Sequence, residues 1–138
     1  MPEPLQRLHF RIQSVNDVSD SRRKGMQLAL EMGFAHADAT KIAVVISELA
    51  RNILIYAKTG TITVLPQQDP DGGPCCIKII ADDKGPGIAH LEQAMTDGYT
   101  TSGGLGLGLS GSKRLMDEFL VYSHVNQGTT ITAVKWLR

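Results

Sequence analysis

The sequence predicts an α/β two-layer sandwich, in which helices pack on a mixed or mostly antiparallel sheet. Its periodicity indicates five strands and three helices, in the order strand, helix, helix, strand, strand, loop, helix, strand, strand. Consecutive strands are joined by turn-rich links, as in hairpins, and the helices are segregated from them. With 138 residues, 42% of them hydrophobic, the chain can form one packed core but not two. We therefore expect a single domain over residues 1–138.

The N-terminal segment predicts a strand followed by a helix. Residues 8–15 alternate apolar and polar side chains, which is typical of a half-buried strand. The apolar positions are Leu8, Phe10 and Ile12. A helix should follow over residues 17–32 and end at Gly33, since glycine is the usual residue after a helix C-terminus.

A second helix should begin near Asp38 or Thr40, either of which can cap it, and should end near Lys58, before Thr59 and Gly60. At 100° per residue, six apolar side chains fall within one stripe roughly 100° wide. They are Ile42, Val45, Ile46, Leu49, Ile53 and Tyr56. We expect this stripe to face the core.

The C-terminal half predicts a hairpin, a long loop, a short helix and two closing strands. The loop is polar and rich in glycine, so we expect an irregular, mobile lid with one helical turn near residues 91–95. The ranges are 61–65 and 75–81 for the hairpin strands, 66–74 for their connection, 82–104 for the loop, about 105–118 for the helix, and 119–124 and 129–137 for the last strands.

The composition argues against nucleic acid and membranes as partners. Fourteen basic residues balance fourteen acidic ones, so no net field would attract nucleic acid or an anionic membrane. The basic run at residues 22–24 is interpreted as a solvated helix face. There is no signal-peptide pattern and no apolar stretch of about 18 residues, which predicts a cytoplasmic protein. Cys75 and Cys76 lack metal-ligand spacing and should be reduced, buried and structural.

Residues 102–113 (SGGLGLGLSGSK) form a glycine run that matches no complete phosphate or nucleophile motif. A dinucleotide-binding loop needs a preceding buried strand and a longer domain after it. Lys113 is one residue out of register for a P-loop, and a nucleophile elbow would need glycine in place of Ser112. The backbone N–H groups of such a loop can still bind phosphates; a simple turn is the alternative.

Two further constellations could carry chemistry. Glu48 and Asn52 are four residues apart on the second helix, so they lie on one helix face at the edge of the apolar stripe. The alternative for this pair is a solvated helix edge. Asp83 follows a buried strand, and Gly85 and Gly87 let the backbone approach a ligand closely. The alternative there is a plain Gly-Pro-Gly turn.

Together and in this order, Glu-x-x-x-Asn, Asp-x-Gly-x-Gly and the spaced glycines resemble the ATP-binding boxes of the GHKL family, which includes gyrase B, Hsp90, histidine kinases and MutL. The resemblance implies a Bergerat-type fold with three helices on one face of the sheet, binding ATP and Mg²⁺. It also implies individual roles: Glu48 as the general base, Asn52 as the Mg²⁺ ligand, Asp83 as the adenine contact supported by Thr129, Gly85 and Gly87 beside the base, and Gly104, Gly106 and Gly108 at the phosphates.

Within that family, the chain resembles the RsbT-type switch kinases of the stressosome, on residues 48–52, 97–104, 113–119 and 133–138. This implies a serine/threonine kinase that phosphorylates STAS-domain antagonist and stressosome scaffold proteins, then binds and activates a PP2C-type phosphatase. Two alternatives stay open. One is an anti-sigma factor kinase that binds a sigma factor directly. The other is a nucleotide-dependent binding module with negligible catalysis.

Overall fold

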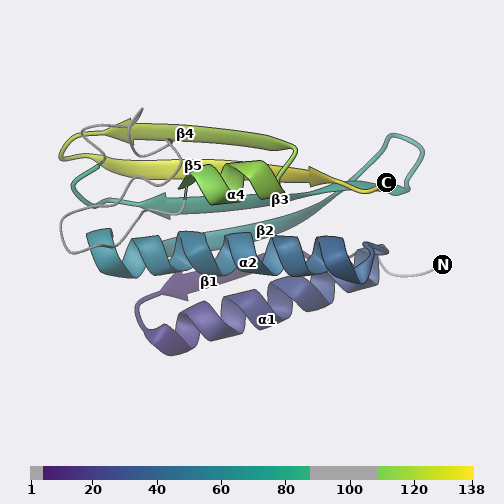
Figure 1. Ribbon diagram of the computed structural model, residues 1–138, viewed down its shortest axis with the longest axis horizontal. Helices are drawn as coiled ribbons and strands as arrows, with labels where there is room; N and C mark the ends of the chain where they lie inside the picture. The colour runs from purple at the N-terminus through teal and green to yellow at the C-terminus, as the bar shows by residue number, and fades with distance from the viewer. Residues whose placement is uncertain (1–4, 88–108) are drawn as a thin grey trace.

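A five-stranded sheet carries helices on one face in the computed structural model, which describes residues 5–87 and 109–138 (Figure 1). The strand order is β1-β2-β3-β5-β4, and every neighbouring pair is antiparallel. The strands are β1 (Leu8–Ile12), β2 (Gly60–Gln68), β3 (Pro74–Asp83), β4 (Glu118–His124) and β5 (Gly128–Trp136). The helical elements are α1 (Val15–Met32), α2 (His36–Asn52), the π-helical turn η1 (Ile53–Ala57) and α4 (Leu109–Leu115). The predicted sandwich and element order are confirmed.

The core lies between α2 and the sheet. The predicted apolar stripe, which runs through α2 and continues into η1, is buried as expected, and only Tyr56 within it is half-buried. Alternate residues of the central strands meet this stripe, including Ile62, Val64, Ile77 and Ile79, all fully buried. Burying side chains of this size stabilises the fold by about 1.5–3 kcal/mol each. Because every second strand residue points to the helices, the residues between them lie on the opposite face, where polar side chains such as Thr63 and Lys78 are mixed with exposed apolar ones such as Leu120.

The structure corrects the predicted start of both long helices. α1 begins at Val15, two residues early, because Ser14 and Asp17 form a capping box: Ser14 Oγ accepts from Asp17 N at 3.3 Å, and the Asp17 carboxylate accepts from Ser14 N at 3.0 Å. Gly33 ends α1 in the left-handed region, as predicted. The chain then restarts a helix at once, so α2 begins at His36 and the proposed caps fall inside its first turns.

Further boundaries also differ from the prediction. The first strand ends at Ile12 rather than residue 15, because Ser14 already caps α1. The β2 and β3 strands extend into their connection as far as Gln68 and Pro74, leaving only a short turn. The last predicted helix ends at Leu115 rather than Glu118, because Asp117 N already bonds to Val134 O in the sheet at 2.9 Å. The helical turn predicted near residues 91–95, and most of the expected lid, lie outside the described residues.

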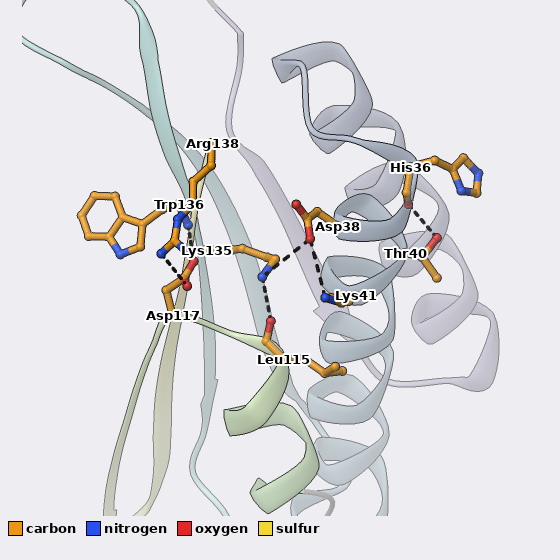
Figure 2. Close-up of polar contacts among 9 residues, drawn as sticks. All are labelled: His36, Asp38, Thr40, Lys41, Leu115, Asp117, Lys135, Trp136 and Arg138. Atoms are coloured by element: carbon orange, nitrogen blue, oxygen red, sulfur yellow. Dashed lines mark hydrogen bonds and ion pairs between the residues drawn. The ribbon is translucent and has the colours of Figure 1, made fainter.

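Lys135 ties α4 to α2 across the core edge (Figure 2). Its side chain is 11% exposed, and Nζ donates to Leu115 O, at the end of α4, at 3.0 Å. The Asp38 carboxylate of α2 lies 4.0 Å from the same ammonium. A buried ammonium requires such partners, because its desolvation is costly. This contact fixes where the short helix after the glycine run sits.

The predictions for the basic run and for the two cysteines are confirmed only in part. The basic run at residues 22–24 is exposed on α1, as expected. Cys76 is buried and free, and burial raises the pKa of its thiol to about 11. Cys75 is also free but only half-buried, so the prediction of two buried cysteines is wrong for it. No helix in the described part of the chain is long and apolar enough to cross a membrane.

Candidate nucleotide site

Asp83 ends β3 beside the first residues of β5. Its carboxylate accepts the backbone N–H of Gly85 at 2.9 Å and that of Thr129, its partner across the ladder. Partial burial raises the pKa of this carboxyl group, and the two hydrogen bonds oppose that shift without cancelling it. The result is a carboxyl group held in one orientation at the end of the sheet. It can accept a hydrogen bond from an amine of a bound ligand.

The two glycines that follow Asp83 are required by close packing. A Cβ on Gly85 would lie 2.6 Å from Cβ of Ala57, too close for any real side chain. Gly87 has φ +77°, and a Cβ there would overlap the backbone carbonyl of His124. The segment is further held by a hydrogen bond from Asn126 N to Pro86 O at 2.6 Å. These positions therefore demand glycine for reasons beyond a simple turn.

Glu48 and Asn52 lie one turn apart near the end of α2, as their spacing predicted. Glu48 is 36% exposed, and its Oε1 accepts from Arg51 Nη1 at 2.9 Å. Asn52 is half-buried and is the last α-helical residue before η1. The π-helical turn then brings Ala57 against Gly85, so it links the end of α2 to the Asp83 segment. Turns of this kind occur often at functional sites.

Thr129 lies next to Asp83 in the register of β3 and β5 and is only 9% exposed. Its Oγ1 forms a 2.9 Å hydrogen bond with Ser123 Oγ of β4. Ser123 and Ala57 were not predicted from the sequence as neighbours of the site. The turn at residues 125–127 was the available signal for Ser123, because a hairpin closed there pairs Ser123 with Thr129. Nothing in the sequence indicated the Ala57 contact.

The structure thus brings together Asp83, Gly85, Gly87 and Thr129. Glu48 and Asn52 lie on α2, and η1 connects them to that cluster. The three glycines assigned to the phosphates, Gly104, Gly106 and Gly108, lie outside the described residues, so their role stays a prediction. The described arrangement is a polar end of the sheet facing the end of a helix, with close backbone packing around one carboxylate.

The family model described as "Histidine kinase-, DNA gyrase B-, and HSP90-like ATPase" matches residues 37–138. The chain belongs to this ATPase family. The match covers α2, η1 and every strand except β1, and therefore all of the candidate site. Membership confirms the predicted family and carries with it the binding of ATP.

Curated relatives define the subgroup. The chain is 49% identical over 128 residues to the serine/threonine-protein kinase RsbT of Bacillus subtilis (strain 168), covering 93% of this chain and 95% of that protein. It is 32% identical over 111 residues to the anti-sigma F factor of Geobacillus sp. (strain WCH70), covering 72% and 70%. The expected enzyme class, an ATP-dependent serine/threonine kinase of a partner-switching type, is supported by these relatives.

Solved structures share the fold at low sequence identity. The RsbU and RsbW domains of a Mycobacterium tuberculosis protein superpose with a TM-score of 0.66 at 21% identity, over 98% of this chain and 34% of that longer one. The SiaB-SiaC complex of Pseudomonas aeruginosa gives a TM-score of 0.68 at 14% identity, over 94% and 88%. At these identities the likeness concerns the fold alone.

Proposed function

We propose that this chain is the switch kinase of a bacterial stress-signalling module. It transfers the γ-phosphoryl group of ATP to serine or threonine of STAS-domain antagonist and stressosome scaffold proteins. After release it binds and activates a PP2C-type phosphatase. The observation that carries the proposal is the 49% identity to RsbT across almost the whole of both chains. A single working domain over residues 1–138 and a cytoplasmic location are parts of the same proposal.

The adenine is assigned to the cluster around Asp83. Two backbone N–H groups already hold the Asp83 carboxylate, so its remaining acceptor capacity has a fixed direction. The exocyclic amine of adenine is a donor of the right kind. Gly85 and Gly87 let the segment after Asp83 pack tightly against Ala57 and the backbone of His124, and we place the flat base beside this segment. Thr129, fixed by Ser123, supports the carboxylate through its backbone N–H.

Mg²⁺ fits the donor set through Asn52. Among the described residues, no group of three His, Cys, Asp or Glu side chains could hold a metal ion. Mg²⁺ usually keeps water and phosphate oxygens and takes few protein ligands, so one amide oxygen at the end of α2 is a sufficient anchor. When bound, the ion would neutralise charge on the phosphates.

Glu48 is the proposed base for phosphoryl transfer. The hydroxyl oxygen of the partner protein forms the new bond to the γ-phosphorus, while the bond from that phosphorus to the bridging oxygen breaks and ADP leaves with its electron pair. The hydroxyl proton passes to the Glu48 carboxylate. In the structure Oε1 of this carboxylate is paired with Arg51 on the helix surface, and the carboxylate has further acceptor capacity for the incoming hydroxyl.

The test uses transfer of label from γ-labelled ATP to a purified STAS-domain protein. Glu48→Gln should lower the transfer rate about 100-fold or more while ATP affinity changes little, since a positioned base contributes about 10²–10⁴-fold. Arg51→Gln is the matched control, because it breaks the same ion pair but keeps the carboxylate. Asp83→Asn should abolish ATP binding itself. If Glu48→Gln and Arg51→Gln lose activity equally, Glu48 is not the base.

An anti-sigma kinase is the second candidate, because the chain is also 32% identical to an anti-sigma F factor. Such a protein holds a sigma factor directly. Affinity purification of the tagged chain separates the two functions: the switch kinase should retain STAS-domain proteins or a phosphatase. Recovery of a sigma factor in stoichiometric amount would favour the second candidate instead.

A further inference from the structure

Two adjacent thiols lie near the start of β3, at the opposite end of the strand from Asp83. The Sγ atoms of Cys75 and Cys76 are 3.6 Å apart. Cys75 is half-buried, and Cys76 is buried without belonging to the main hydrophobic core. The next residue, Ile77, points into that core, so Cys76 lies on the sheet face away from the helices. Neither sulfur is part of the candidate nucleotide site.

A β-bulge accounts for the short distance between the two sulfurs. Successive residues of a regular strand point to opposite faces, which would hold the sulfurs apart. In the described ladder, Gln67 of β2 faces Cys76, and Gln68 faces Pro74. Cys75 is therefore the extra residue of a bulge, and a bulge re-aims a side chain out of the regular alternation. The two cysteines act as a pair for this reason, which their spacing in the sequence did not predict.

The 3.6 Å separation suits one atom placed between the sulfurs better than it suits a disulfide. A disulfide needs an S–S distance of about 2.05 Å, and adjacent Cα atoms, about 3.8 Å apart, lie closer than a disulfide normally allows. The ladder also resists closure, since Leu137 N donates to Cys75 O at 2.9 Å. An atom bonded to both sulfurs at roughly 2.3 Å, a typical thiolate–metal length, would have an S–X–S angle of roughly 100°.

The small number of ligands selects among atoms that bind thiolates. Zn²⁺ takes four ligands, and among the described residues no group of three His, Cys, Asp or Glu side chains could hold a metal ion. A linear two-thiolate ion such as Cu⁺ would need the sulfurs roughly 4.6 Å apart, about twice one bond length. Trivalent arsenic is soft and pyramidal, and its third position can keep a hydroxyl group. Two thiolates at this angle are therefore enough for it.

We propose that Cys75 and Cys76 form a dithiol site for trivalent arsenic, taken up as arsenite, As(OH)₃. Two As–O bonds break and two As–S bonds form. Each thiol proton leaves with one hydroxyl group as water, and no electron is transferred, so the product is a dithiolate that keeps one As–OH group. Cys76 Sγ donates to Gln67 Oε1 at 3.4 Å, and the As–OH group can replace it as the donor. The site is independent of ATP and of the proposed kinase activity.

The test begins with native mass spectrometry of the reduced full chain in thiol-free buffer with sodium arsenite. The wild type should gain one AsOH unit and lose two hydrogens. Cys75→Ser and Cys76→Ser should each bind at least about tenfold more weakly, because the second As–S bond forms within the chain only when both thiols are present. These are the two cysteines of the sequence, so no other thiol competes. A wild type without this adduct, or a Cys75→Ser variant that binds as tightly, would overturn the proposal.

Thermal unfolding tests whether the fold holds the two sulfurs ready. A ligand that binds the native state more tightly than the unfolded chain raises the midpoint of unfolding. Arsenite should therefore raise the midpoint of the wild type and leave that of Cys75→Ser unchanged. The half-buried position of Cys75 makes this variant the one best able to fold. If the wild-type adduct forms but the midpoint stays constant or falls, the bulge does not preorganise the pair, and the proposed site is wrong.

Discussion

At the scale of single residues, Asp83 shows a balance between burial and hydrogen bonding. Burial disfavours its charged form more than the N–H groups of Gly85 and Thr129 favour it, so the pKa of this carboxyl group is raised in the folded protein. A carboxyl group whose ionised form is disfavoured by the folded protein is typical of a binding or catalytic site. Its presence here agrees with the role proposed from the sequence.

The raised pKa gives a test by pH. Between the ordinary value of 3.8 and the higher folded value, the folded protein holds a proton that the unfolded chain has released. The contribution of Asp83 to the free energy of unfolding must therefore fall as pH rises through this window. In urea unfolding from pH 4 to 7, the wild type should lose stability relative to Asp83→Asn and then level off. A relative gain in stability with pH would contradict this.

At this scale the positions of Glu48, Asn52 and Asp83 could be predicted because their signals are local, whereas the roles given to the site residues stay predictions. The spacing of Glu48 and Asn52 on one helix indicates that they lie together, and the position of Asp83 directly after a buried strand indicates a site residue. The partners that fix these residues come from elsewhere in the chain. Ser123 reaches Thr129 through the pairing of β4 with β5, for which the turn at residues 125–127 was the available signal in the sequence.

At the scale of elements, the packing of η1 against the segment after Asp83 could not be predicted from the sequence. Helix and strand periods predicted every α-helix and strand of the described chain but not the π-helical turn η1, and the contact of Ala57 with Gly85 joins distant segments. Boundaries failed where a competing hydrogen bond was stronger than the local pattern. Asp117 N bonding to the sheet, for example, cut the last helix short.

Gly85→Ala tests this contact. Because its Cβ would lie 2.6 Å from that of Ala57, the substitution should lower the free energy of unfolding by about 1–3 kcal/mol. Gly111→Ala is the control. Gly111 lies within α4 with nothing near its Cβ position, so this substitution should raise the free energy of unfolding by up to about 1 kcal/mol. Urea unfolding measures both. Equal effects would mean that the Ala57 contact is not tight.

At the scale of the whole molecule, α4 is held to the rest of the fold by Leu109, which is buried in the core, and by the hydrogen bond from Lys135 to its last residue. The sequence predicted five strands but not that β5 would lie between β3 and β4, an order set by the crossover of the intervening segment. That order places Lys135 of β5 between α4 and α2 (Figure 2). A single buried ammonium thus joins three elements that are distant in sequence.

Lys135→Met should lower the free energy of unfolding by about 1–3 kcal/mol, since it leaves Leu115 O without its charged donor. Asp38→Asn should cost less than about 1 kcal/mol, because the Asp38 side chain is 37% exposed and 4.0 Å from the ammonium. Chemical denaturation of both variants gives the comparison. An Asp38 variant as unstable as the Lys135 variant would show that the ion pair, not the carbonyl, carries the contact.

The π-helical turn at Ile53–Ala57 has a consequence for the history of the family. A π turn holds one residue more than the α turn it replaces, and it commonly marks a single inserted residue. Relatives that continue α2 as a regular helix should accordingly be one residue shorter between the asparagine equivalent to Asn52 and the start of β2. An alignment gap confined to that interval would date the insertion relative to the divergence of switch kinases from anti-sigma factors.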